Sequence, residues 1–134
     1  MKSYTYARAF QAALIGIAIT GSATLARADI KDYEFQLVDK TIKKGDAIIS
    51  VRLVHKPDGK AVLDAVIFAT RLDMAPDGMQ EMATKVTPMP GAEPGIYRFK
   101  ANLSMAGGWQ LSLGAKVQGE TGTVENKLVL KATP

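Results

Sequence analysis

The fold of this chain is decided by the stretch from residue 96 to residue 117, which reads IYRFKANLSMAGGWQLSLGAKV. Apolar residues occupy every second position in its first half, and they do so again in its second half from Trp109 onward. Period-two alternation over runs of this length is typical of half-buried antiparallel strands. The stretch therefore predicts two strands, 96–103 and 108–117, joined by a short loop.

Five further stretches show strand patterns and extend this prediction in both directions. They are residues 33–38, 47–54, 62–72, 82–88 and 123–131. The third is almost continuously apolar, as expected for a central strand covered on both faces, and the fourth has the weakest pattern. Pro-Gly and Asp-Gly turns separate the stretches, and none shows a sustained helical period. Seven short antiparallel strands with frequent turns predict an all-β, immunoglobulin-like sandwich.

The first 28 residues have the pattern of a secretory signal peptide. A basic start precedes a short apolar stretch at residues 9–19, and Ala26-Arg27-Ala28 is an A-x-A cleavage site. The apolar stretch is too short to span a bilayer comfortably. We expect cleavage between Ala28 and Asp29, which leaves one periplasmic domain, residues 29–134, that does not insert into a membrane.

The composition excludes several classes of function. The chain has 17 basic and 13 acidic residues, and three of the basic ones lie in the expected signal, which leaves 14 against 13 in the mature part. No basic patch with interleaved aromatic residues appears, so we expect no nucleic-acid partner. There is no cysteine, and His55 is the single histidine. Neither a Cys/His zinc site nor a nucleophile with its base can be assembled, so we expect no enzymatic activity.

A methionine-rich segment, DMAPDGMQEM at residues 73–82, is the strongest functional signal. Three thioethers and three carboxylates lie there among Pro and Gly, where a loop is expected. Soft thioether sulfur favours Cu(I) over harder ions, which makes Cu(I) the one cofactor that these residues suggest. Methionine is also an ordinary filler of irregular gaps in a core, so the packing interpretation stays open.

Alternating strand directions predict where these methionines gather. If each strand reverses direction, the 73–81 loop and the 102–107 loop share one end of the sandwich, whereas His55 and Met89 fall at the other. The first end would then carry a set of four metal ligands and three accessory groups. The ligands are Met74, Met79, Met82 and Met105, and the accessory residues are Asp73, Asp77 and Trp109. The alternative is that the acids are solvated turn formers and Trp109 is a core residue.

Three segments of the chain resemble one known family. They are DMAPDGM at 73–79, PGIYRF at 94–99 and MAGGWQLSL at 105–113, and together they resemble the YtkA-like/FixH-like family of small exported or membrane-tethered sandwich domains. The resemblance covers residues 33–131. It implies a role beside heavy-metal efflux adaptors or, for the FixH branch, in copper delivery to or assembly of the cbb3-type oxidase. Met74, Met79 and Met105 match the recurrent methionines of the family. The cleavable signal departs from FixH and favours a free periplasmic role.

Two hypotheses follow from the residues and the resemblance. In the first, the protein is a periplasmic copper(I)-binding accessory protein that hands copper to a periplasmic or membrane protein of a metal efflux or assembly system. In the second, it is a metal-free interaction module that docks on a membrane efflux or oxidase-assembly complex, because a sandwich fold by itself does not imply a chemistry.

Overall fold

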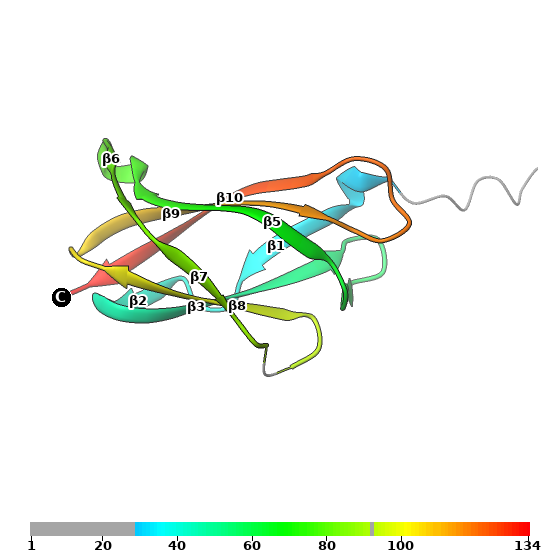
Figure 1. Ribbon diagram of the computed structural model, residues 1–134, viewed down its shortest axis with the longest axis horizontal. Helices are drawn as coiled ribbons and strands as arrows, with labels where there is room; N and C mark the ends of the chain where they lie inside the picture. The colour runs from blue at the N-terminus through cyan, green and yellow to red at the C-terminus, as the bar shows by residue number, and fades with distance from the viewer. Residues whose placement is uncertain (1–28, 92) are drawn as a thin grey trace, which may run out of the picture.

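The computed structural model describes residues 29–91 and 93–134, and the expected signal peptide, residues 1–28, lies outside the described residues. Two five-stranded sheets form a sandwich (Figure 1). In the first sheet the order is β1 (Tyr33–Leu37), β3 (Gly45–His55), β8 (Ile96–Leu103) and β7 (Val86–Met89), and β4 (Lys60–Ala61) pairs with β3. In the second sheet the order is β2 (Thr41–Lys43), β10 (Val124–Thr133), β9 (Gly107–Lys116), β5 (Val66–Met74) and β6 (Met79–Thr84). Two short 3-10 turns, Ile30–Asp32 and Ala75–Asp77, complete the described elements.

This strand order is that of an immunoglobulin-like sandwich. The first sheet runs β1-β3-β8-β7 and the core of the second runs β5-β9-β10. If the principal strands are lettered A to G along the chain, these orders are A-B-E-D and C-F-G, which define the fold. The all-β, immunoglobulin-like prediction is therefore confirmed, although the described residues form ten strands where seven were expected.

The two strands that decided the prediction supply much of the core. Their alternate residues are buried between the sheets, and Phe99, Leu103, Trp109 and Leu111 are each no more than 2% exposed. Burial of a large apolar side chain of this kind stabilises the fold by roughly 1.5–3 kcal/mol. Strands β8 and β9 belong to different sheets, so the two patterns meet face to face across the core.

The expectation for residues 62–72 was wrong in two respects. Strand β5 begins only at Val66, because the Tyr97 hydroxyl donates to the Val62 carbonyl at 2.7 Å and accepts from the Ala65 N–H at 3.1 Å. These bonds hold residues 62–65 in a loop. The strand is also not covered on both faces, since Val66 and Phe68 are 59% and 56% exposed.

The expectation of a single strand over residues 82–88 was also wrong. The chain leaves the second sheet after Thr84, the last residue of β6, and joins the first sheet at Val86, where β7 begins. Figure 1 shows β6 and β7 following one another across the side of the sandwich. This division, together with the short strands β2 and β4, accounts for the three additional strands. No helix among the described residues is long and apolar enough to cross a membrane.

Candidate functional site

The methionine-rich segment and the loop of Met105 lie at the same end of the sandwich. Strand β5 pairs antiparallel with β9, and Asp73 near the end of β5 faces Gln110 near the start of β9. The turn that follows β5 therefore lies beside the loop that precedes β9. The convergence predicted from alternating strand directions is confirmed.

Direct contacts join the turn after β5 to the first residues of β9 and the loop before them. The Gly108 N–H donates a hydrogen bond to Asp77 Oδ2 at 3.1 Å. Gly107 lies so close to the segment that a Cβ atom there would be 3.0 Å from the Met74 methyl carbon and would overlap the Asp77 carboxylate. On the other side of the loop, Trp109 Nε1 donates to the Met105 carbonyl oxygen at 3.0 Å. The first residues of β9 are thus held over the Met74 side chain.

The four methionines differ in their access to solvent. Met74 is fully buried at 0% exposure, and its Cα partner across the β5–β6 ladder is Met79. Met79 and Met82 are partly buried and pack against the hydrophobic core. Met105 is 41% exposed. The structure therefore brings Met74 and Met79 together below a loop on which Met105 faces solvent.

The three expected accessory groups have structural contacts of their own. Asp73 is 4% exposed, and its two carboxylate oxygens accept from Arg71 Nε at 2.8 Å and from the Ala75 N–H at 3.0 Å. Asp77 accepts from Gly108 at the start of β9, and Trp109 is a core residue at 1% exposure. Over residues 29–91 and 93–134, no group of three or more Asp, Glu or His side chains could hold a metal ion. A metal at this end of the sandwich would depend on thioether sulfur.

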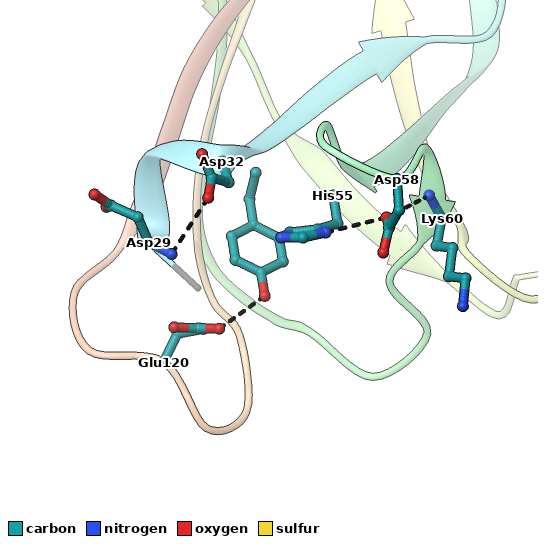
Figure 2. Close-up of polar contacts among 7 residues, drawn as sticks. Asp29, Asp32, His55, Asp58, Lys60 and Glu120 are labelled. Carbon is teal, nitrogen blue, oxygen red and sulfur yellow. Dashed lines mark hydrogen bonds and ion pairs between the residues drawn. The ribbon is translucent and has the colours of Figure 1, made fainter. Parts of the chain in front are cut away.

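His55 lies at the opposite end, as expected, in a polar cluster that sequence reasoning missed (Figure 2). Its Nδ1 lies 3.0 Å from Asp58 Oδ1, and its ring centroid is 5.0 Å from that of Tyr33. The Tyr33 hydroxyl donates to Glu120 Oε2 at 2.9 Å. Burial, aided by this bond to Glu120, raises the pKa of Tyr33 to about 12. Tyr33 and Glu120 are 87 residues apart in the chain, so no local sequence pattern predicts their contact.

The Asp58 carboxylate in this cluster has strong local partners. The Lys60 N–H donates to its Oδ1 at 3.0 Å, and this bond, followed by the one to His55, lowers the pKa of Asp58. His55 Nε2 is buried and has no hydrogen-bond partner among the described residues. The cluster thus fixes the turn between β3 and β4 and does not bring together a set of metal ligands.

The comparisons with known proteins establish the family. The family model described as YtkA-like matches residues 27–114, more than half of the chain, and the protein belongs to the YtkA-like family. Among solved structures, the filamin domain of Lin-41 is similar, with 19% identity, a TM-score of 0.46, and coverage of 80% of this chain and 95% of that one. No curated protein matches the sequence significantly.

Proposed function

We propose that this protein is a non-catalytic, periplasmic copper-handling accessory protein that binds Cu(I) through Met74, Met79, Met82 and Met105. In this proposal the signal peptide is removed after Ala28, and the mature domain passes copper to a periplasmic or membrane protein of a metal efflux or assembly system. The observation that carries the proposal is the meeting of two methionine-bearing loops at one end of a rigid sandwich.

The chemistry of the ligands supports Cu(I) in particular. Thioethers are soft, uncharged donors, and they favour Cu(I) over oxygen-seeking ions such as Mg²⁺ and Ca²⁺. The carboxylates of Asp73 and Asp77 are already engaged by Arg71, Ala75 and Gly108. In the proposal Asp77 joins the turn after β5 to the start of β9, Asp73 orders its own segment, and both contribute negative charge near the cation.

The different exposures of the four methionines suggest the order in which a copper ion would reach them. Met105 is the most exposed of the four thioethers, so a copper ion arriving from solvent meets it first. Met74 is reached only when the start of β9 moves away from it, because Gly107 packs against its methyl group. Met105 is thus the entry ligand in this proposal, and Met74 is the innermost one.

An anaerobic titration with Cu(I) against a competing chelator tests the proposal. We expect one ion per protein, with shifts of the Met74, Met79 and Met105 methyl signals in NMR spectra. Because two ligands are removed, Met79→Leu with Met105→Leu should weaken binding by at least about 100-fold, at tenfold per 1.4 kcal/mol. Leucine replaces methionine with little loss of stability, so a change in Cu(I) affinity reports the loss of a ligand and not the loss of the fold.

Met89→Leu is the matched control, because Met89 is partly buried at the end of β7, on the far side of the sandwich. Its Cu(I) affinity should equal that of the unsubstituted protein. An unchanged affinity after Met79→Leu with Met105→Leu, or after Met74→Leu with Met79→Leu, would show that the ligand assignment is wrong.

The burial of Met74 favours a second candidate function. A methionine at 0% exposure is what core packing produces, and Met79 and Met82 pack on the same core. In that case the domain is a metal-free module that docks on a membrane efflux or oxidase-assembly complex. Co-purification of the same partner by apo protein in the presence of a Cu(I) chelator would favour this function over the first.

A further inference from the structure

Strand β5 has a long stretch of backbone that no strand pairs with on one side in the described part of the chain. Its nine residues run from Val66 to Met74, and β9 pairs with it from Val66 to Asp73, with a register shift that leaves Phe68 unpaired. On the other side β6 pairs only with Leu72, Asp73 and Met74. Among the described residues no strand pairs with that side of β5 from Val66 to Arg71. We call this stretch, with the three residues before it, the free edge, residues 63–71.

The middle of the free edge, residues 65–70, has only one of the features by which sheets normally prevent association through their edges. Such features are short edge strands, charged side chains, prolines and β-bulges. Residues 65–70 read AVIFAT, without a charge or a proline, and the one such feature is a bulge at Phe68, where the pairing with β9 shifts register. The other edges of the two sheets do carry such features: β2 is three residues long with Lys43, β7 has Pro88, β6 has Glu81, β1 has Glu34, and β10 has Glu125 and Lys127.

Exposed apolar side chains concentrate on this edge. Of the seven large hydrophobic residues that are exposed in the described part of the chain, Leu63, Val66 and Phe68 lie within six consecutive positions. Their exposed fractions are 63%, 59% and 56%. Exposed apolar residues scattered singly are ordinary on a protein surface, whereas a contiguous group indicates an interaction site.

The free edge also lies between two hollows. Toward the first sheet, a groove of about 570 Å³ is lined by Leu63, Ile67 and Met89 among others. On the outer face of the second sheet, a hollow of about 450 Å³ lies along Phe68 and Gly114. Successive side chains of a strand point to opposite faces, so a strand added to this edge would place its side chains alternately in the two hollows.

We propose that the free edge pairs antiparallel with the same edge of a second copy of this chain. The two five-stranded sheets then join edge to edge around a twofold axis near Ile67 and Phe68. An isologous contact of this kind requires a self-complementary surface. The free edge meets this requirement, because its apolar middle faces itself and its two ends carry opposite charges.

The charges at the ends select the antiparallel direction. Asp64 is exposed just before the strand, and Arg71 is exposed at the far end of the unpaired stretch. Antiparallel pairing brings Asp64 of each copy toward Arg71 of the other, twice by symmetry, whereas parallel pairing would set like charges together. Arg71 is held in place by Asp73 and by the Gln80 carbonyl, so its position at this end is fixed.

Sedimentation equilibrium of the exported protein, over concentrations from about 1 μM to about 1 mM, tests the proposal, since weak specific contacts fall in this range. We expect a reversible monomer–dimer equilibrium. Phe68→Lys should weaken dimerisation by at least about tenfold, because it places a lysine from each copy next to the twofold axis. Asp64→Lys should also weaken it, because a lysine would then face Arg71 of the other copy.

Val129→Lys is the matched control. Val129 is 55% exposed, close to the value for Phe68, and it lies on β10 in the same sheet, away from the free edge. This variant should dimerise like the unsubstituted protein. Circular dichroism checks that each variant is folded, and Val66→Lys replaces Phe68→Lys if the latter is not.

Two results would overturn the proposal. One is a protein that stays monomeric up to the highest concentration, which would leave the edge to an extended segment of a different protein. The other is a dimer that Phe68→Lys and Val66→Lys leave intact, which would place the contact elsewhere on the surface.

Discussion

Gly107→Ala probes the contact between the first residue of β9 and the Met74 side chain. Gly107 has a backbone φ of 138°, a conformation that residues with a side chain rarely adopt. A Cβ atom at this position would overlap the carboxylate of Asp77 and lie 3.0 Å from the Met74 methyl carbon. The substitution therefore introduces backbone strain and displaces a carboxylate that accepts from the neighbouring Gly108 N–H.

The expected loss of stability is the sum of these two effects. Holding alanine in this backbone region costs about 1–3 kcal/mol. Loss of the Asp77–Gly108 hydrogen bond at this exposed position adds about 1–2 kcal/mol. Gly107→Ala should thus lower the free energy of unfolding by about 2–5 kcal/mol, a large fraction of the total for a domain of this size.

Gly45→Ala is the matched control, because Gly45 also has a positive φ, of 107°, but a Cβ atom there would meet nothing within 4 Å. This variant should show the strain alone, so Gly107→Ala should exceed it by about 1–2 kcal/mol. Equilibrium unfolding in urea measures both differences, and methyl NMR shows whether the Met74 signal moves. Equal losses in the two variants would refute the idea that the Asp77 carboxylate and Met74 crowd this position.

Two further predictions concern polar side chains that have hydrogen-bond partners, Asp73 and Tyr33. Asp73→Ala should lower the free energy of unfolding by about 1–3 kcal/mol, because it removes the carboxylate that accepts from the Ala75 N–H and from Arg71. The control is Asp46→Ala, since the exposed Asp46 also accepts a hydrogen bond, from Asn102. Thermal unfolding compares the two variants, and equal effects would contradict the assigned role of Asp73. Because the pKa of Tyr33 is raised to about 12 from its ordinary value of 10.0, the folded protein keeps this proton longer than the unfolded chain does. The contribution of Tyr33 to the free energy of unfolding is complete below pH 10 and is lost as the pH rises through about 12. Tyr33→Phe should therefore reduce the loss of stability at alkaline pH. Phenolate absorbance that titrates entirely near pH 10 would contradict the raised pKa.

The expected positions of the strands agreed best with the structure where the local pattern was strongest. Residues 96–103 form β8 as predicted, and β9 differs by one residue at each end from the range 108–117. In both strands the alternate apolar residues are buried, because a two-residue period assigns every second side chain to one face. The placement of the methionines and His55 at opposite ends also followed from the sequence, because it depended only on counting strand reversals.

The expectations failed where a distant residue decides the local conformation. Residues 62–65 are apolar and resemble a strand, but the Tyr97 hydroxyl, more than thirty residues away, binds their backbone. The crossing between sheets at Lys85 leaves no mark in the alternation, because a strand has the same period in either sheet. The different exposed fractions of the four methionines also could not be predicted. The sequence places all four at one end of the sandwich but does not show which of them is covered by the start of β9.

The sequence by itself determined the all-β class, the buried faces of the main strands, the family, and the end of the sandwich at which the methionine segment lies. These properties rest on local periodicity and on the order of strands along the chain. Only the tertiary structure decided that Asp73 is buried against Arg71, that Met74 lies under Gly107, and that residues 66–71 have an unpaired side. Each of these depends on contacts between residues that pairing and packing bring together, and a periodic pattern carries no information about its partner.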